Sequence, residues 1–281
     1  MSRFSIPSKS TGRAAVALAL VAGILTFAVF SMGASEPGDA NGAEGRQGGR
    51  QQGAPGPTVT VGSKHFTEQK ILGNVVAELI EQRTDIPVDR GAIGLSGTKM
   101  AFGALESGEI DIYPEYTGTG LVNILGEEYR PGTSREDILS RVREEFRKQW
   151  NLTWLDPLGF ENSYAFAMRE QDAEHMGITR VSDLEGHLDE LQPGFDHEFV
   201  DRPEFARIPD VYGFEFVKGA VRLLQPSLMY AAADEGEVDL IDAFTTDGRI
   251  QAYDLRILQD DKGLFPPYDA CLVVRQETLD K

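Results

Sequence analysis

Short strand patterns that alternate with helix patterns constrain the fold of this 281-residue chain more than any other feature. We expect a strand at residues 58–61, a helix at 67–83, a strand at 88–91, a helix at 98–107 and a strand at 110–113. The first helix repeats apolar side chains every three or four positions, at Ile71, Leu72, Val75, Val76, Leu79 and Ile80. Because strands in βαβα order run side by side in one direction, the pattern predicts a parallel sheet.

A second α/β unit is expected after about residue 160. Before it, Ser134 and Asp137 have the spacing of a capping box, so we expect a helix that ends at Trp150 and then a strand at 152–155. The second unit should contain strands at 164–168, 195–200 and 238–244, a short helix from 182–184, and a helix at 220–234 that Pro226 bends or breaks. Two α/β lobes joined by extended crossovers form a clamshell, whose ligand lies near strand C-termini and helix N-termini.

The N-terminal part of the chain differs from the rest in composition. A basic start, an uncharged and mostly apolar stretch at 14–30, and small residues after it predict a signal peptide or membrane anchor at residues 1–35. Residues 36–57 are rich in Gly, Gln, Ala and Pro, which predicts a disordered tether. The folded two-lobed domain is expected at 58–281, with lobe 1 at about 58–160 plus 268–281 and lobe 2 at about 164–265. The protein is therefore expected to be extracytoplasmic.

Charge and cysteine content exclude several classes of protein. The formal net charge of -18 argues against a nucleic-acid partner, and a solvated surface is the ordinary explanation of such acidity. The single cysteine, Cys271, excludes an internal disulfide, and its apolar neighbours predict a buried packing role.

Three distant segments each place a tyrosine beside polar residues, at 115–119, 162–165 and 266–269. Rings gathered from such segments can surround a quaternary ammonium, which has no N–H to donate and is stabilised by roughly 0.5 to 2 kcal/mol per aromatic face. Taken singly, each tyrosine is more often a packing residue.

Four separated motifs carry a specific resemblance. They are Val-Gly-Ser-Lys-His-Phe-Thr-Glu-Gln at 61–69, Gly-Glu-Ile-Asp-Ile-Tyr-Pro-Glu-Tyr-Thr-Gly-Thr at 108–119, Thr-Thr-Asp-Gly-Arg-Ile at 245–250, and the stretch from Asp-Asp-Lys to Pro-Pro-Tyr at 260–268. In this order they resemble the substrate-binding proteins of osmoprotectant ABC importers, the glycine betaine, carnitine and choline binders of the OpuAC type, close to the ProX and OpuBC/OpuCC branch. The resemblance runs from about residue 58 to the end. It implies a type II periplasmic-binding-protein fold that closes on a compatible solute and delivers it to a membrane permease.

The resemblance also implies roles for individual residues. Its motifs place an aromatic box at Tyr116, Tyr164, Phe244 and Tyr268, and a receptor for the ligand carboxylate at Lys64, Thr119 and Arg202, with Gln69 on the same edge. Two positions depart from some relatives. Phe244 stands where some relatives have tyrosine, so a hydroxyl is absent. Asn162 stands where some relatives have an acidic residue. Its neutral amide leaves the rings as the main means of cation recognition.

Other functions have weaker support in the sequence. Lys64 could be a solvated surface lysine, Arg202 could pair with its acidic neighbours, and Thr119 could be a turn residue. Glu109, Asp111 and Glu115 could in principle form a glycosidase pair, but the chain has no paired metal-binding histidines, no Walker loop and no nucleophile elbow. We therefore expect a monomeric binding protein without catalytic residues, cofactor or metal. A tethered ligand-sensing domain of the same fold stays as the alternative.

Overall fold

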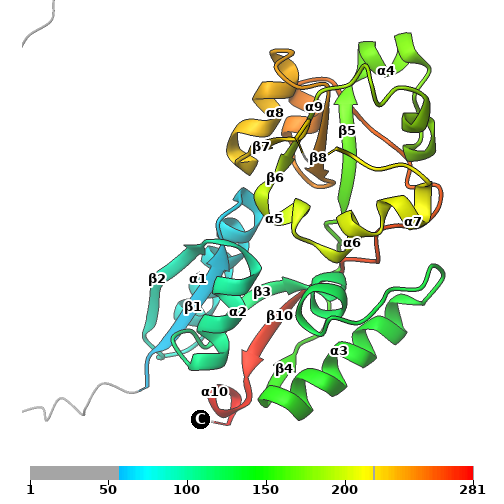
Figure 1. Ribbon diagram of the computed structural model, residues 1–281. Helices are drawn as coiled ribbons and strands as arrows, with labels where there is room; N and C mark the ends of the chain where they lie inside the picture. Colours follow the sequence, from blue (N-terminus) through cyan, green and yellow to red (C-terminus); the bar gives the residue numbers. More distant parts are fainter. Residues whose placement is uncertain (1–56, 218, 281) are drawn as a thin grey trace, which may run out of the picture. The chain divides into compact units, whose positions relative to one another are not determined.

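The computed structural model describes residues 57–217 and 219–280, which form two five-stranded sheets (Figure 1). The strand order is β2-β1-β3-β10-β4 in the first lobe and β7-β6-β8-β5-β9 in the second. Helices follow most strands in both lobes. The arrangement confirms the predicted α/β fold with two lobes.

The first lobe contains the parallel pairs that the βαβα pattern predicts. β1 is parallel to β2 and β3, whereas β10, near the chain's end, is antiparallel to β3 and β4. The side chain of Ser134 accepts the Asp137 N–H at 3.1 Å, which confirms the expected N-cap of α3. The strands are β1 (Val59–Lys64), β2 (Val88–Leu95), β3 (Ile112–Tyr116), β4 (Leu152–Trp154) and β10 (Ala270–Arg275), and the helices are α1 (Thr67–Arg83), α2 (Gly97–Ser107), the π-helix η1 (Thr119–Ile124), α3 (Arg135–Trp150) and α10 (Gln276–Leu279).

The second lobe combines parallel and antiparallel pairs in the same way. β6 is parallel to β7 and β8, and β5 is antiparallel to β8 and β9. Its strands are β5 (Tyr164–Arg169), β6 (Pro193–Asp196), β7 (Arg222–Leu224), β8 (Leu240–Phe244) and β9 (Leu255–Ile257), and its helices are α4 (Glu170–Met176), the 3-10 helix η2 (Val181–Gly186), α5 (His197–Val200), α6 (Pro203–Ala206), α7 (Ile208–Tyr212), α8 (Pro226–Asp234) and α9 (Arg249–Ala252).

Two expectations for this lobe are wrong. The predicted strand at 195–200 is the end of β6 followed by α5, because Asp196 takes the extended conformation of an N-cap and a helical turn follows it. The predicted helix at 220–234 is strand β7 followed by α8. Pro226 begins α8, so the helix is broken there as predicted: proline needs no N–H partner in the first turn and obstructs any turn before it.

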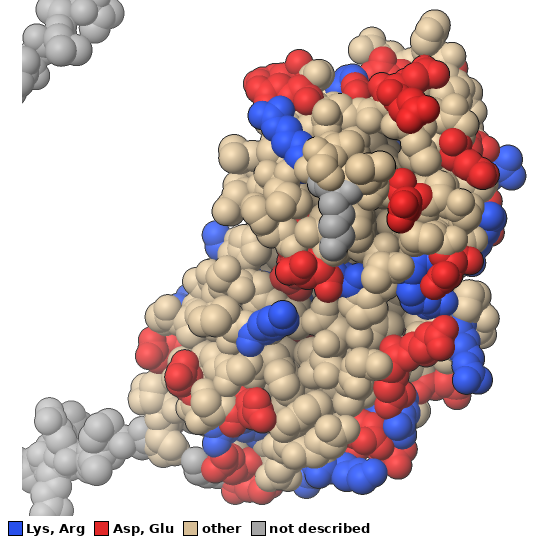
Figure 2. All heavy atoms as spheres, viewed as in Figure 1, with Lys and Arg blue, Asp and Glu red and all other residues tan. Residues whose placement is uncertain are grey.

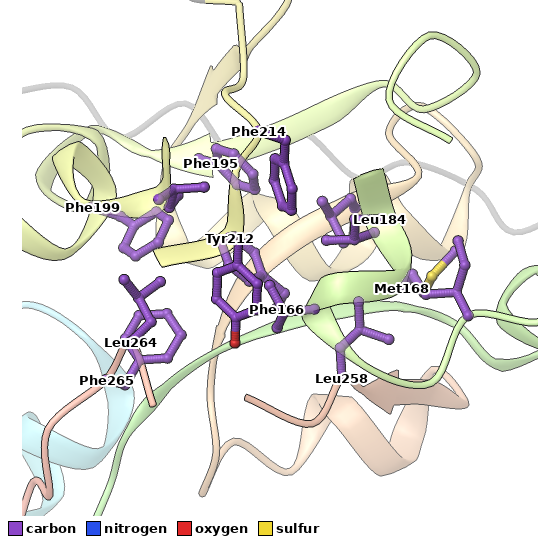
Figure 3. Packing of buried hydrophobic residues seen from close by; sticks show 14 of the residues in the cluster. Phe166, Met168, Leu184, Phe195, Phe199, Tyr212, Phe214, Leu258, Leu264 and Phe265 are labelled. Carbon is purple, nitrogen blue, oxygen red and sulfur yellow. The ribbon is translucent and has the colours of Figure 1, made fainter. Parts of the chain in front are cut away.

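A phenylalanine-rich core in the second lobe supports the cleft. The rings of Phe166, Phe195 and Phe199 are fully buried, with centroids 5.6 to 5.7 Å apart (Figure 3). Phe199 also stacks on Tyr164 at 5.3 Å. Helix α5 and the first residue of β5 are therefore fixed to each other through this core.

Two crossovers connect the lobes, one between β4 and β5 and one between β9 and β10. They pair with each other at Glu161 and Asp269, and the Asn162 N–H donates to the Tyr268 carbonyl at 3.1 Å. Asn162 and Tyr268 therefore lie side by side at the junction of the lobes.

Within residues 57–217 and 219–280, no helix combines the length and the apolar character that a membrane span requires. The predicted signal peptide or membrane anchor at residues 1–35 lies outside the described residues, as does all of the predicted tether except Pro57. Acidic and basic side chains are interspersed over the face of the molecule in Figure 2. Cys271 is buried, as predicted, and burial, with Asp269 adding to it, raises the pKa of its thiol to about 12.

Candidate functional site

A cavity between the lobes is bordered by most of the residues that the sequence predicts for the site. Its free volume is about 20 Å³, so its walls nearly meet. Eight of the nine predicted residues line it: Lys64, Tyr116, Thr119, Asn162, Tyr164, Arg202, Phe244 and Tyr268. They come from the first lobe, the second lobe and both crossovers.

Strand pairing brings the four predicted rings together. Tyr164 begins β5 and Phe244 ends β8, and these two residues are partners in the antiparallel ladder, with ring centroids 5.2 Å apart. Tyr116 ends β3 opposite Ala270, two residues beyond Tyr268. The Tyr164 and Tyr268 rings are 6.0 Å apart and nearly perpendicular. Tyr116, Phe244 and Tyr268 are buried, and Tyr164 is half-buried.

A fifth ring, Phe66, belongs to the same cluster and was not predicted. It precedes α1 and stacks on Phe244 at 4.7 Å and on Tyr116 at 6.3 Å. Phe66 lies in the first lobe and Phe244 in the second, so this stack crosses the cleft. The motif at 61–69 contained Phe66, but only the fold shows that its ring turns toward the cleft.

Lys64 is buried at the end of β1 and is not the surface lysine that its turn position could suggest. Its Nζ donates to Glu115 Oε1 at 2.6 Å and to Thr98 Oγ1 at 3.3 Å, and it lies 5.3 Å from the centre of the Tyr116 ring. Glu115 is fully buried, so this ion pair compensates both charges inside the protein. The third ammonium N–H of Lys64 is not used by these two acceptors.

Arg202 is also buried and contacts residues of both lobes and of one crossover. Its Nη2 donates to Glu204 Oε1 at 2.9 Å, to the Tyr268 hydroxyl at 3.2 Å and, weakly, to Thr119 Oγ1 at 3.5 Å. Its guanidinium carbon lies 4.7 Å from the Tyr164 ring centre and 5.8 Å from that of Tyr268. The nearest carboxylate to Nη1, that of Glu198, is 3.6 Å away. The pairing with an acidic neighbour that the sequence allowed is present, and the same side chain also faces the cavity.

The two amides differ in their placement. Gln69 lies behind the cavity wall, where it accepts the Lys64 backbone N–H at 3.1 Å and donates to the Pro114 carbonyl at 2.9 Å. It therefore fixes the end of β1 against β3 and does not line the cavity. Asn162 does line it. Its Nδ2 donates to Glu68 at 2.9 Å, and its buried Oδ1 has no hydrogen-bond partner among the described residues.

Two acidic residues on the cavity wall were missed by the sequence analysis. Burial, with Glu198 adding to it, raises the pKa of Asp196 to about 6. Although burial alone would raise the pKa of Glu198, the charge of Lys64 and a hydrogen bond from Thr98 lower it overall. Behind Asp196, burial first and the Asp196 charge second raise the pKa of Asp242, whose Oδ1 accepts the Asp196 N–H at 2.7 Å. The wall is therefore acidic as well as aromatic.

Comparison with known proteins identifies the family. Residues 57–281 match the OpuAC family, described as the substrate binding domain of ABC-type glycine betaine transport system. The chain belongs to the OpuAC family. It is therefore the solute-binding component of an ABC importer for quaternary ammonium osmoprotectants, and it is not an enzyme.

Individual relatives of this OpuAC protein agree with the family. A glycine-betaine-binding protein of Pseudomonas aeruginosa is 39% identical over 241 residues, which is 81% of this chain and 75% of the relative. The carnitine transport binding protein OpuCC of Listeria monocytogenes is 35% identical, over 80% of this chain and 72% of its own. A crystal structure of a glycine betaine/carnitine/choline ABC transporter is 31% identical, with a TM-score of 0.61 over 79% of this chain and 81% of that one. The structure of apo YehZ from Escherichia coli is 30% identical, with a TM-score of 0.55 over 79% of this chain and 82% of that one.

The raised pKa of Asp196 leads to a pH prediction. A ligand cation held in the aromatic cluster would stabilise the ionised carboxylate and lower the pKa of Asp196, so below pH about 6 the free protein has to release the Asp196 proton when it binds the ligand. We expect the affinity for choline to fall roughly threefold to tenfold between about pH 7 and pH 5. Titration calorimetry of the protein and of Asp196→Asn measures this dependence.

The Asp196→Asn protein should show a flatter profile. His65 lines the same cavity, and burial lowers the pKa of its imidazole, so the comparison of the two proteins isolates the aspartate from the histidine. The same slope in both proteins would exclude Asp196 as the titrating group.

Proposed function

We propose that this OpuAC protein binds a quaternary ammonium solute that also carries a carboxylate, such as glycine betaine or carnitine. The observation that carries the proposal is the meeting of five rings with two buried cations, Lys64 and Arg202, around one cavity. Rings suit the methylated end of such a ligand, and the cations suit its carboxylate.

The cation is assigned to the cage, the cluster formed by Phe66, Tyr116, Tyr164, Phe244 and Tyr268. A quaternary ammonium has no N–H, so ring faces stabilise it without leaving a donor unsatisfied. Phe244 provides such a face without a hydroxyl. The ring of Phe66 adds a face from the first lobe, so closure of the lobes completes the cage.

The carboxylate is assigned to Arg202, Lys64 and Thr119. Glu204 and Glu115 already compensate the two cations, so the ligand is not needed to neutralise them. Donors remain, however: Lys64 has a third N–H, and Nη1 of Arg202 makes no hydrogen bond to any described residue. Thr119 Oγ1 lies beside Arg202 and can orient one carboxylate oxygen.

Membership of an importer family supports delivery of the solute to a membrane permease. We propose that the protein acts as a monomer outside the cytoplasmic membrane, exported or anchored by residues 1–35. The negative net charge of the chain argues against a nucleic-acid partner.

A sensing role is the second candidate. A chemotactic signal transduction system substrate-binding protein, CosB of Halobacterium salinarum, is 25% identical over 78% of this chain and 70% of its own. Deletion of the gene separates the two functions: loss of solute uptake supports transport, and loss of chemotaxis with normal uptake supports sensing.

The cage can be tested ring by ring. Tyr116→Ala, Tyr164→Ala and Tyr268→Ala should each weaken glycine betaine binding by roughly 1 to 3 kcal/mol, because a ring face is lost and water enters the cage. Calorimetry measures affinity, and thermal unfolding without ligand controls for folding. Tyr253→Ala is a matched control, since Tyr253 follows α9 and does not line the cavity. If all three cage variants had dissociation constants within twofold of that of the unsubstituted protein, the assignment of the cage would be refuted.

The carboxylate site is tested by comparing two ligands on one variant. Arg202→Ala should reduce glycine betaine affinity by about 2 to 4 kcal/mol, because a desolvated carboxylate loses charge-assisted bonds. Choline lacks that group and should lose far less. Arg180→Ala removes an exposed arginine of the same lobe and serves as the charge control. Equal losses for both ligands would mean that Arg202 supports folding or closure and does not contact the carboxylate.

A further inference from the structure

Glu68, in the first turn of α1, contacts three separate parts of the protein. Its Oε1 accepts the Tyr116 hydroxyl at 2.5 Å and the Asn162 Nδ2 at 2.9 Å, and its Oε2 accepts the Thr246 hydroxyl at 2.6 Å. Tyr116 belongs to the first lobe, Asn162 to a crossover and Thr246 to the loop after β8 in the second lobe. One carboxylate thus joins both lobes and the connection between them.

These contacts place Glu68 beside the cage without making it part of the cavity wall. Tyr116 and Asn162 line the cavity, whereas Glu68 and Thr246 border a neighbouring hollow of about 250 Å³ that shares Phe66, Asn162 and Phe244 with it. The Glu68 side chain is half-buried and Thr246 is exposed, so the contact between them forms at the rim of the cleft.

The chemistry of each contact gives Glu68 two effects. The hydroxyl of Tyr116 is buried and needs an acceptor, so Glu68 fixes the orientation of a cage ring. The bond from Thr246 can exist only when the second lobe is near α1, so it stabilises the closed arrangement over an open one.

We propose that Glu68 is a positioning residue that couples the cage to lobe closure: it orients Tyr116 from the first lobe and holds Thr246 of the second, and so prolongs the residence of the bound solute. The proposal rests on the proposed function for the identity of the ligand, but the contact between the lobes exists in the protein itself. Removal of that contact should therefore change the lifetime of the closed state with or without ligand.

The first test measures binding kinetics on the full chain with glycine betaine by stopped-flow fluorescence. Thr246→Val removes the hydroxyl and keeps a similar shape. It should raise the dissociation rate about threefold to tenfold and change the association rate less than twofold, because closure follows encounter. Glu68→Gln should raise the dissociation rate at least as much, since it weakens all three contacts. The unfolding midpoint without ligand should stay the same in Thr246→Val.

A double variant distinguishes coupling from separate defects. If the two residues act through one contact, Glu68→Gln with Thr246→Val should dissociate no faster than Glu68→Gln alone. Glu81→Gln is the matched control, because Glu81 lies on the same helix and, among the described residues, forms its ion pair with Arg90 of its own lobe. The proposal would be overturned if both single variants had dissociation rates within twofold of that of the unsubstituted protein. It would also be overturned if the increase in dissociation rate of the double variant equalled the product of the two single increases.

The second test needs no ligand and separates this proposal from the proposed function. Dyes on Glu136→Cys in the first lobe and Glu190→Cys in the second report lobe separation by single-molecule energy transfer, and the buried Cys271 is protected from labelling. Closed-state lifetimes should be severalfold shorter in Glu68→Gln and Thr246→Val than in the parent protein. Equal lifetimes, or no closed state in the ligand-free parent, would overturn the role of Glu68 even if the solute binds as proposed. Shorter lifetimes without solute binding would instead refute only the proposed function.

Discussion

The compensation of one buried cation, Arg202, organises the cleft. A guanidinium removed from water is costly unless charge and hydrogen bonds replace the lost hydration. Glu204 supplies the charge from the same lobe, Tyr268 and Thr119 supply oxygen atoms from the crossover and the first lobe, and Tyr164 supplies a ring face. The first lobe repeats the arrangement on a smaller scale, with Lys64 held by Glu115 under the ring of Tyr116. Aromatic faces and buried charges therefore adjoin one another around the cavity, and this arrangement is the basis of our proposal that the ligand carries both a cation and a carboxylate.

Two glutamates extend this construction to the edges of the cleft. Glu68 of the first lobe accepts Thr246 of the second, and Glu198 of the second lobe accepts both the side chain and the backbone N–H of Thr98, at the start of α2 in the first. The second contact uses the free N–H groups at a helix N-terminus. Because both contacts join the first lobe to the second, separation of the lobes breaks both. Side chains that border the cavity thus lie next to the contacts that hold the lobes together.

The sequence predicted the parts of the site that recur as local motifs. Tyr116, Tyr164, Phe244 and Tyr268 stand at or near strand ends, and the helix at 67–83 has clear apolar periodicity. It could not predict Phe66, Asp196 or Glu198, because their roles depend on where distant segments meet. Gln69 was expected on the ligand's edge, but its amide is used to join β1 to β3. The two wrong elements have different causes. The short apolar run at 195–200 fits a strand or a helix equally well, and the packing of Phe195 and Phe199 decides between them, whereas the helix expected at 220–234 begins only at Pro226.

Recognition of a cation that has no N–H is the central claim, and a methylation series tests it most directly. Titration calorimetry with glycine, sarcosine, dimethylglycine and glycine betaine changes only the number of methyl groups on one nitrogen. We predict that affinity rises along the series and gains about tenfold or more at the last methyl group, where the final N–H disappears and no unsatisfied donor is left among the rings. Equal affinities for dimethylglycine and glycine betaine would contradict it.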